Sequence, residues 1–318
     1  MFEGNTATGG SRQDTTDRPT PVGLQFGRVR TVAARPSEGP LETAVVPTCL
    51  ATVQDGVDKY TQSCSGGAQI QESPDRTQFK LQTGDISEEH SSAGVQSFLD
   101  SFVDTETIPP NAGVVYAAST INDDYATILE PILEDHGSGQ LLRVFPSSFC
   151  GSIPAIGDAL EALSELYINV ELGSSTLDAC VYRRGERVVP FSTMSLSGAL
   201  TARRTGSDST EDGTLNRLKR GGRAALMGYI SDVVEVIANE FLPQLARRSI
   251  TLYKRTLDRP IVCSGTMAAI PGLRGALEDA LGSELRRDVS LVVPRQPETA
   301  GARGAQRIAA RLIESQNY

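Results

Sequence analysis

The chain has 318 residues, of which 39% are hydrophobic, and it carries a formal net charge of −9 with a pI near 4.9. This length suits one large domain or two of roughly 150 residues, and the acidic balance argues against a protein that binds nucleic acid directly. Twenty-six of the 30 basic residues are arginine. An acidic chain that avoids lysine is typical of a salt-rich cytoplasm, where salt screens carboxylate repulsion. A GC-rich genome also replaces lysine with arginine.

Neither a zinc site nor a membrane span is expected. The five cysteines include no C-x-x-C pair and only two histidines are present, so we interpret the cysteines as buried thiols in a reducing cytoplasm. No stretch of the sequence approaches 18 apolar residues. Residues 1–20 lack the basic start and apolar run of a signal peptide and are expected to form a disordered arm. We therefore expect a cytoplasmic protein.

The first half of the chain reads as strands followed by alternating strands and helices. A strand, a glycine turn and the start of a second strand are predicted over VGLQFGRVRT, residues 22–31. The polar stretch at about 55–95 indicates a small insertion, with one strand pair around TQFKLQTG. After it, we predict a buried strand in GVVYAAS, a capped helix in NDDYATILEPILEDHG, a strand in LLRVFP and a helix in PAIGDALEALSEL.

The second half repeats this order. NVELGSSTLD, residues 169–178, matches the opening hairpin and places Glu171 opposite Gln25 and Gly173 opposite Gly27, at an offset of 146. Strands in PIVCSG and VSLVVP alternate with helices in PGLRGALEDALG and GARGAQRIAARLIES. We therefore expect an α/β fold made of a duplicated β-β-β-α-β-α unit. The expected lobes are residues 21–165 and 166–318, the second with a reduced insertion at about 199–222.

A glycine hairpin from each lobe predicts a ligand in the cleft between them. Such turns can present backbone N–H groups to a phosphate. In the second turn, Gly173 allows a close approach and three hydroxyl donors follow it. A third element, PIVCSGTMAAIPGL at 260–273, predicts a strand, a glycine turn and a helix N-terminus, where a purine or its phosphates can pack against the backbone.

These three elements, in this order and spacing, resemble the phosphate-1, phosphate-2 and adenosine motifs of the actin-like ATPases, in particular the prokaryotic MreB and ParM types. The family turns I-G-I-D-L-G-T and D-I-G-G-G-T-T-E compare with VGLQFGR and ELGSSTLD. The adenosine motif I-V-L-T-G-G-G-A-x-L-x-G-L compares with IVCSGTMAAIPGL. The resemblance covers roughly residues 21–314. Together with the composition, it points to a haloarchaeal cytoskeletal actin with an actin/RNase H-like fold.

The resemblance implies that ATP or ADP binds with Mg²⁺ between the lobes. The segment TLNRLKRGG, residues 214–222, resembles the family helix that holds the ribose. The implied catalytic residues are Glu171 and Gln25, and Glu171 is the implied metal residue, holding Mg²⁺ through water. The implied nucleotide-binding residues are Gly27, Arg28, Gly173, Ser174, Ser175, Thr176, Asn216, Lys219, Gly265, Thr266 and Met267.

Departures from the family pattern make nucleotide binding better supported than hydrolysis. Gln25 stands where the family has an acid that orders water around Mg²⁺, and an amide supplies no charge. The segment PSSFCGSIPAIG has no acid where the family places a water-orienting Glu or Gln, and Ser147 and Ser148 could position water only weakly. Removing one such group slows hydrolysis on the order of 100-fold or more.

Three functions therefore stay open. The first is an actin homologue that assembles head to tail with itself and hydrolyses ATP slowly. The second is an actin-fold scaffold or polymer without turnover, which Gln25 and the missing acid favour. The third is a small-molecule kinase of the same superfamily, although no catalytic Asp for a sugar hydroxyl is evident.

Overall fold

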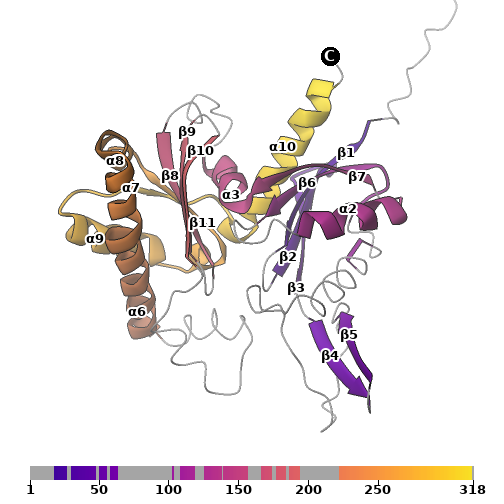
Figure 1. The fold of residues 1–318 in the computed structure, drawn as a ribbon, viewed down its shortest axis with the longest axis horizontal. Coiled ribbons are helices and arrows are strands. Elements are labelled where there is room, and N and C mark those ends of the chain that lie inside the picture. The colour runs from indigo at the N-terminus through magenta and orange to yellow at the C-terminus, as the bar shows by residue number, and fades with distance from the viewer. Residues whose placement is uncertain are drawn as a thin grey trace, which may run out of the picture.

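The computed structural model describes residues 18–26, 30–47, 50–55, 58–63, 102–103, 108–118, 125–137, 139–156, 166–173, 177–183, 186–193 and 222–316. Two five-stranded mixed sheets dominate these residues (Figure 1). The first has the order β3-β2-β1-β6-β7, in which β1 pairs antiparallel with β2 and parallel with β6. Its strands are β1 (Thr20–Phe26), β2 (Arg30–Arg35), β3 (Glu42–Pro47), β6 (Ala112–Ala118) and β7 (Gly139–Pro146).

The second sheet repeats the first strand for strand. Its order is β10-β9-β8-β11-β12, with β8 antiparallel to β9 and parallel to β11. Because β8 occupies the place of β1, the predicted duplicated α/β architecture is confirmed. The strands are β8 (Leu166–Leu172), β9 (Leu177–Arg183), β10 (Glu186–Thr193), β11 (Ile261–Ser264) and β12 (Leu291–Val292).

The alternation of side chains along each strand decides which helix covers which face of the first sheet. Leu24 and Tyr116 pack with Leu129 and Leu133 of α2 (Tyr125–Asp135) on one face. Their neighbours in the strands point the other way, and Val115 packs with alanines of α10 (Ala300–Gln316). Every residue of β6 is buried, as expected for a strand covered on both faces.

The second sheet is covered in the same way. Its outer face packs on a helical layer of α6 (Gly222–Glu235), the π-helical turn Val236–Phe241, α7 (Leu242–Arg248), α8 (Ile250–Leu257) and α9 (Leu273–Leu285). Its inner face packs on α3 (Ser147–Ile156), whose Phe149 and Ile153 contact Tyr167 and Tyr182. Ser249 separates α7 from α8, because its side chain accepts the Leu252 N–H and caps α8.

The two halves exchange helices. Helix α3 follows a strand of the first sheet but packs on the second, whereas α10 follows the second sheet but packs on the first. The helices cross so closely that a Cβ on Gly304 would lie 1.8 Å from the Cys150 carbonyl oxygen. On the sheet side, a Cβ on Gly23 would lie 1.9 Å from the Ala302 carbonyl oxygen. Glycine is required at both positions because backbone approaches backbone.

Several expected elements have different limits in the structure. The helix expected from Pro154 begins seven residues earlier, at Ser147, directly where β7 ends. Leu166, expected to end that helix, is the first residue of β8. Strand β12 spans two residues of the predicted VSLVVP. At the start of the insertion expected at about 55–95, β5 (Asp58–Ser63) forms a separate hairpin with β4 (Leu50–Asp55), which precedes the expected insertion. The strand pair around TQFKLQTG, residues 1–17 and residues 199–221 lie outside the described residues.

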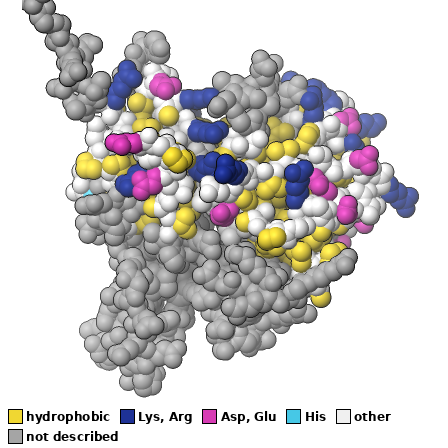
Figure 2. All heavy atoms as spheres, turned by 180° about the vertical axis from the view of Figure 1, so that it is seen from behind, with side chains coloured by type: hydrophobic (Ala, Val, Ile, Leu, Met, Phe, Trp, Pro, Cys, Tyr) yellow, Lys and Arg dark blue, Asp and Glu magenta, His cyan; other side chains and the backbone are white. Residues whose placement is uncertain are grey.

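The surface of the described residues carries charges of both signs. Seen from behind, Lys and Arg side chains gather near the middle of the molecule (Figure 2). Within the described ranges, no helix has the length and apolar character needed to cross a membrane.

Replacing Gly304 by alanine is expected to destabilise the protein by about 1–3 kcal/mol, because α3 and α10 must separate to admit a methyl group. The free energy of unfolding, measured by urea denaturation, tests this. Gly275→Ala in α9 is the matched control, since nothing lies within 4 Å of its Cβ position and alanine favours a helix over glycine. Equal stability of both variants would contradict the close crossing.

Candidate functional site

Equivalent residues of the two halves meet at the carboxyl ends of the central strands. Gln25 of β1 donates a hydrogen bond from Nε2 to Oε1 of Glu171 in β8, at 3.1 Å and across 146 residues of chain. This offset is the one predicted from the repeat. Ligands of open α/β sheets bind beyond the carboxyl ends of the strands, so the pair lies where a ligand is expected.

Each partner of this pair also lies against the start of a crossing helix. Ser147, the first residue of α3, donates from Oγ to Oε2 of Glu171 at 2.6 Å. On the other side, a Cβ on Gly301 at the start of α10 would lie 2.3 Å from Oε1 of Gln25. The positive ends of two helix dipoles therefore converge on the site, which favours a negatively charged group.

Ser147 is the residue whose role sequence reasoning missed. We expected it to position water only weakly, and its contact with Glu171 follows no local pattern. The sole signal was a hydroxyl residue immediately after the strand that ends the first sheet. Because α3 packs on the second sheet, that hydroxyl reaches the acid of β8.

The Glu171 carboxylate is enclosed and lies near a second acid. Burial and, to a lesser extent, the negative charge of Asp178 raise the pKa of Glu171 to about 7, although the hydrogen bonds from Ser147 and Gln25 act in the opposite direction. Asp178 is buried and stands directly opposite Glu171 in the β8–β9 pairing. Like charges in this register repel, so the pair of acids provides a favourable place for a cation.

The donor set fits Mg²⁺ bound mainly through water. Within the described residues, no group of three or more His, Cys, Asp or Glu side chains surrounds a metal position. Mg²⁺ commonly takes one or two carboxylates and fills its remaining positions with water and substrate phosphates. Oε1 of Gln25 is a buried acceptor without a hydrogen-bond partner. Glu171 and Asp178 are thus suited to hold a hydrated cation.

The expected adenosine turn packs against the end of β8. Gly265 has φ 97°, a conformation that favours glycine, and a Cβ there would lie 2.4 Å from the Leu172 carbonyl oxygen. Its N–H donates to the Pro297 carbonyl. Thr266 begins a 3₁₀ turn, Thr266–Ala269, in which the Met267 side chain is fully buried in the core. Met267 therefore has only its backbone to offer a nucleotide.

The structure brings together part of the predicted site. Gln25, Glu171, Gly173, Gly265, Thr266 and Met267 are described, and the Gly173 carbonyl accepts a hydrogen bond from the Tyr229 hydroxyl at 3.3 Å. Outside the described residues lie Gly27, Arg28, Ser174, Ser175, Thr176, Asn216 and Lys219.

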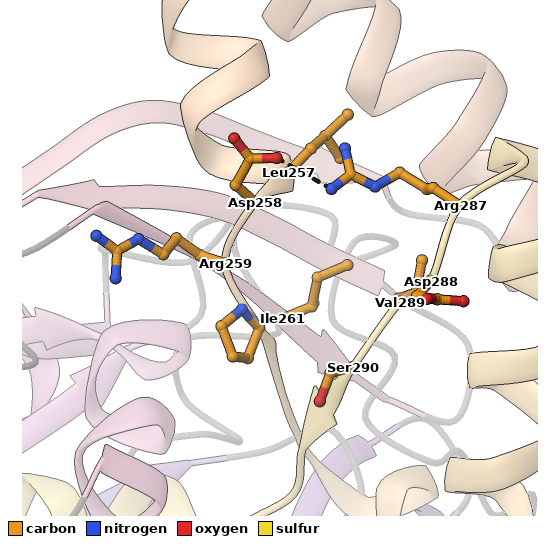
Figure 3. Close-up of a pocket in the computed structure, with 9 residues that line it drawn as sticks. Leu257, Asp258, Arg259, Ile261, Arg287, Asp288, Val289 and Ser290 are labelled. Carbon is orange, nitrogen blue, oxygen red and sulfur yellow. Dashed lines mark hydrogen bonds and ion pairs between the residues drawn. The ribbon is translucent and has the colours of Figure 1, made fainter.

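A separate pocket of about 170 Å³ lies at the opposite end of the second sheet, where β11 and β12 begin (Figure 3). Arg287 and Asp258 form an ion pair of 3.1 Å across its rim. Leu257, Ile261 and Val289 supply apolar walls. This pocket lies at the amino ends of the strands and contains none of the predicted site residues.

Solved structures with an actin fold match this chain along most of its length. MreB5 of Spiroplasma citri bound to ADP aligns with a TM-score of 0.69 and 12% identity, covering 94% of this chain and 98% of that one. A non-polymerising mutant of MamK bound to AMPPNP aligns with a TM-score of 0.54 and 15% identity, covering 92% and 99%. The protein is thus an actin-fold protein, and the predicted resemblance is confirmed.

Sequence comparison narrows this class. A family model described as Salactin matches residues 19–220 and 210–313. Salactin of Halobacterium salinarum is 32% identical, with 95% of this chain and 94% of the relative covered. The chain belongs to the salactin family.

Titration of Glu171 is expected to make stability depend on pH. The pKa of about 7 in the folded state lies above the ordinary value of 4.5, so folding favours the protonated acid. The contribution of Glu171 to stability should be most favourable below pH 4.5, fall as the pH rises to about 7, and level off above it. The size of this fall is on the order of 1–3 kcal/mol.

Unfolding by urea at several pH values, with a chelator and without nucleotide, measures this effect. Glu171→Gln should remove most of the slope between pH 4.5 and 7. A slope that persists unchanged in this variant would assign the titration to other groups.

Proposed function

We propose that this protein is a cytoskeletal actin homologue that binds ATP or ADP with Mg²⁺ between two lobes, assembles head to tail into filaments and hydrolyses ATP slowly. The single observation that carries the proposal is the contact of Gln25 and Ser147 with Glu171 at the carboxyl ends of β1 and β8. We also propose the division into an arm at 1–20 and lobes at 21–165 and 166–318. The ADP and AMPPNP bound to MreB5 and MamK support a nucleotide at this site.

In the proposed reaction, the oxygen of a water attacks the γ-phosphorus and the bond to the bridging oxygen of ADP breaks. The attacking water loses a proton, which Glu171 accepts and passes to solvent. A pKa of about 7 suits a general base near neutral pH. Mg²⁺, when bound, neutralises phosphate charge. Gly173 and the Gly265 turn would bring backbone close to the phosphates and the adenosine, where glycine leaves room for the ligand.

Slow turnover follows from the chemistry of the residues that contact Glu171. Gln25 and Ser147 are both uncharged donors, so neither adds a second base or a second charge to order water. Phosphoryl transfer depends almost entirely on positioning and electrostatic stabilisation. A polymer that does not hydrolyse ATP is therefore the second candidate function. It is favoured by the hydrogen bond from the Gln25 amide to one oxygen of Glu171.

Pelleting and phosphate release in high salt distinguish these functions. We expect filaments that require ATP and Mg²⁺ and release phosphate slowly. Filaments without nucleotide dependence or phosphate release would favour the inert polymer. ATP consumption that requires a small-molecule substrate, without polymer, would indicate a kinase. Absence of both ATP binding and polymer would refute the proposal.

Loss of the Ser147 hydroxyl is expected to lower turnover by about 10- to 100-fold, as loss of a positioning partner commonly does. Ser147→Ala should leave ATP affinity nearly unchanged, because the hydroxyl contacts Glu171 and not the glycine turns. Ser147→Thr keeps the hydroxyl and should retain most of the activity. Single-turnover phosphate release and nucleotide titration measure the two effects.

Ser152→Ala is the matched control on the same helix. The Ser152 hydroxyl is buried and contacts the Tyr167 hydroxyl at 2.9 Å, away from Glu171. This variant should lose stability and keep its turnover per folded molecule. Equal turnover losses in Ser147→Ala and Ser152→Ala would show that Ser147 acts only through stability.

A further inference from the structure

Helix α10 carries an arginine row in which Arg311 is exposed and Arg303 and Arg307 are partly buried. Arg303, Arg307 and Arg311 are four residues apart and so lie along one side of the helix. The opposite side is formed by Ala302, Ala305 and Ala309, all fully buried. Figure 2 shows basic side chains gathered near the middle of the face that is seen from behind. The row is a concentrated positive feature on a chain whose net charge is −9.

Positive charge outweighs negative charge along α10 and the turn before it. Residues 295–314 contain four arginines and two glutamates, Glu298 and Glu314. The Arg303 guanidinium donates a hydrogen bond to the Arg295 carbonyl, which fixes the position of this guanidinium. Partial burial, together with repulsion from Arg307 and Arg295, lowers the pKa of Arg303, and Glu298 only partly opposes this. An anionic partner would relieve this repulsion.

Helix α2 carries the complementary charge. Glu130, Glu134 and Asp135 are exposed, and residues 121–140 contain no lysine or arginine. We call these three residues the acidic face. Leu129 and Leu133 anchor α2 to the outer face of the first sheet, whereas α10 packs on the inner face of that sheet. The sheet separates the two charged features, so they cannot meet within one molecule.

We propose that the arginine row of α10 docks on the acidic face of α2 of a second copy of this chain, as a lateral contact between assembled molecules. Two different surfaces of one molecule make a heterologous contact, which repeats without closing. This inference rests on the proposed polymer. Each exposed ion pair is weak. The contact therefore stabilises association only when a filament presents many copies of both surfaces at once.

Charge reversal tests the contact. Arg303→Glu/Arg307→Glu/Arg311→Glu makes the row negative, and Glu130→Lys/Glu134→Lys/Asp135→Lys makes the acidic face positive. Each set alone should raise the protein concentration needed for lateral bundles by about tenfold or more, since three weak pairs are lost. Bundles are collected by low-speed centrifugation with ATP and Mg²⁺, and single filaments by high-speed centrifugation.

Combining both sets in one chain is the decisive variant. It restores opposite charges across the contact, so bundling should return. Arg303 and Arg307 are partly buried, and reversing their charge can prevent the α10 variant from folding. The α2 substitutions are at exposed residues, so the α2 variant still tests the contact in that case. Mixing the α2 variant with wild type should then give intermediate bundling. Higher salt should weaken wild-type bundles, because screening shortens the range of exposed charges.

Other outcomes overturn the inference. Bundling that is unchanged by either set, or that the combined variant fails to restore, would exclude this contact while leaving the ATP-dependent filament intact. Binding of wild type to anionic vesicles or to DNA, lost in the arginine variant and not restored by the α2 set, would assign the row to that partner instead. Wild type that forms no polymer and binds no ATP would refute the proposed function and this contact together.

Discussion

Where α3 and α10 cross, the backbones of Gly304 and Cys150 lie too close for any side chain to stand between them. Each helix leaves one sheet and packs on the other, so the sheets cannot part unless both helices lose their contacts. The two interfaces differ in chemistry. Helix α10 presents alanine and glycine to the first sheet, whereas α3 presents hydroxyls to the second, with Ser148 and the Tyr182 hydroxyl 2.7 Å apart. Buried polar contacts of this kind hold a single geometry.

That geometry determines what the candidate site can do. Ser147 precedes Ser148 at the start of α3, so the polar interface that fixes the helix also aims the Ser147 hydroxyl at Glu171. The acid belongs to the second sheet and both of its donors belong to the first half of the chain. The Glu171 carboxylate therefore keeps its two hydrogen bonds only while the two halves of the chain are in contact. The proposed chemistry depends on these hydrogen bonds.

Sequence reasoning succeeded where a pattern repeats and failed where a contact is purely spatial. The constant offset predicted that Gln25 and Glu171 occupy equivalent places, because a duplicated fold superposes its repeats. The start of α3 was placed too late, since Pro154 reads as a helix beginning although proline also fits inside this helix. Asp178 was not among the implied site residues, yet strand pairing sets it opposite Glu171. No local pattern could reveal the Ser147 contact, because helix exchange creates it.

The contact between Gln25 and Glu171 shows how the two repeats differ at equivalent positions. Where two repeats of one fold meet, equivalent residues can face each other, as Gln25 and Glu171 do. Two carboxylates at this separation would repel each other unless a cation lay between them. With an amide on one side, the pair attracts. The two repeats thus differ in charge at a pair of equivalent positions that meet, and this contact is favourable without a cation between the two side chains.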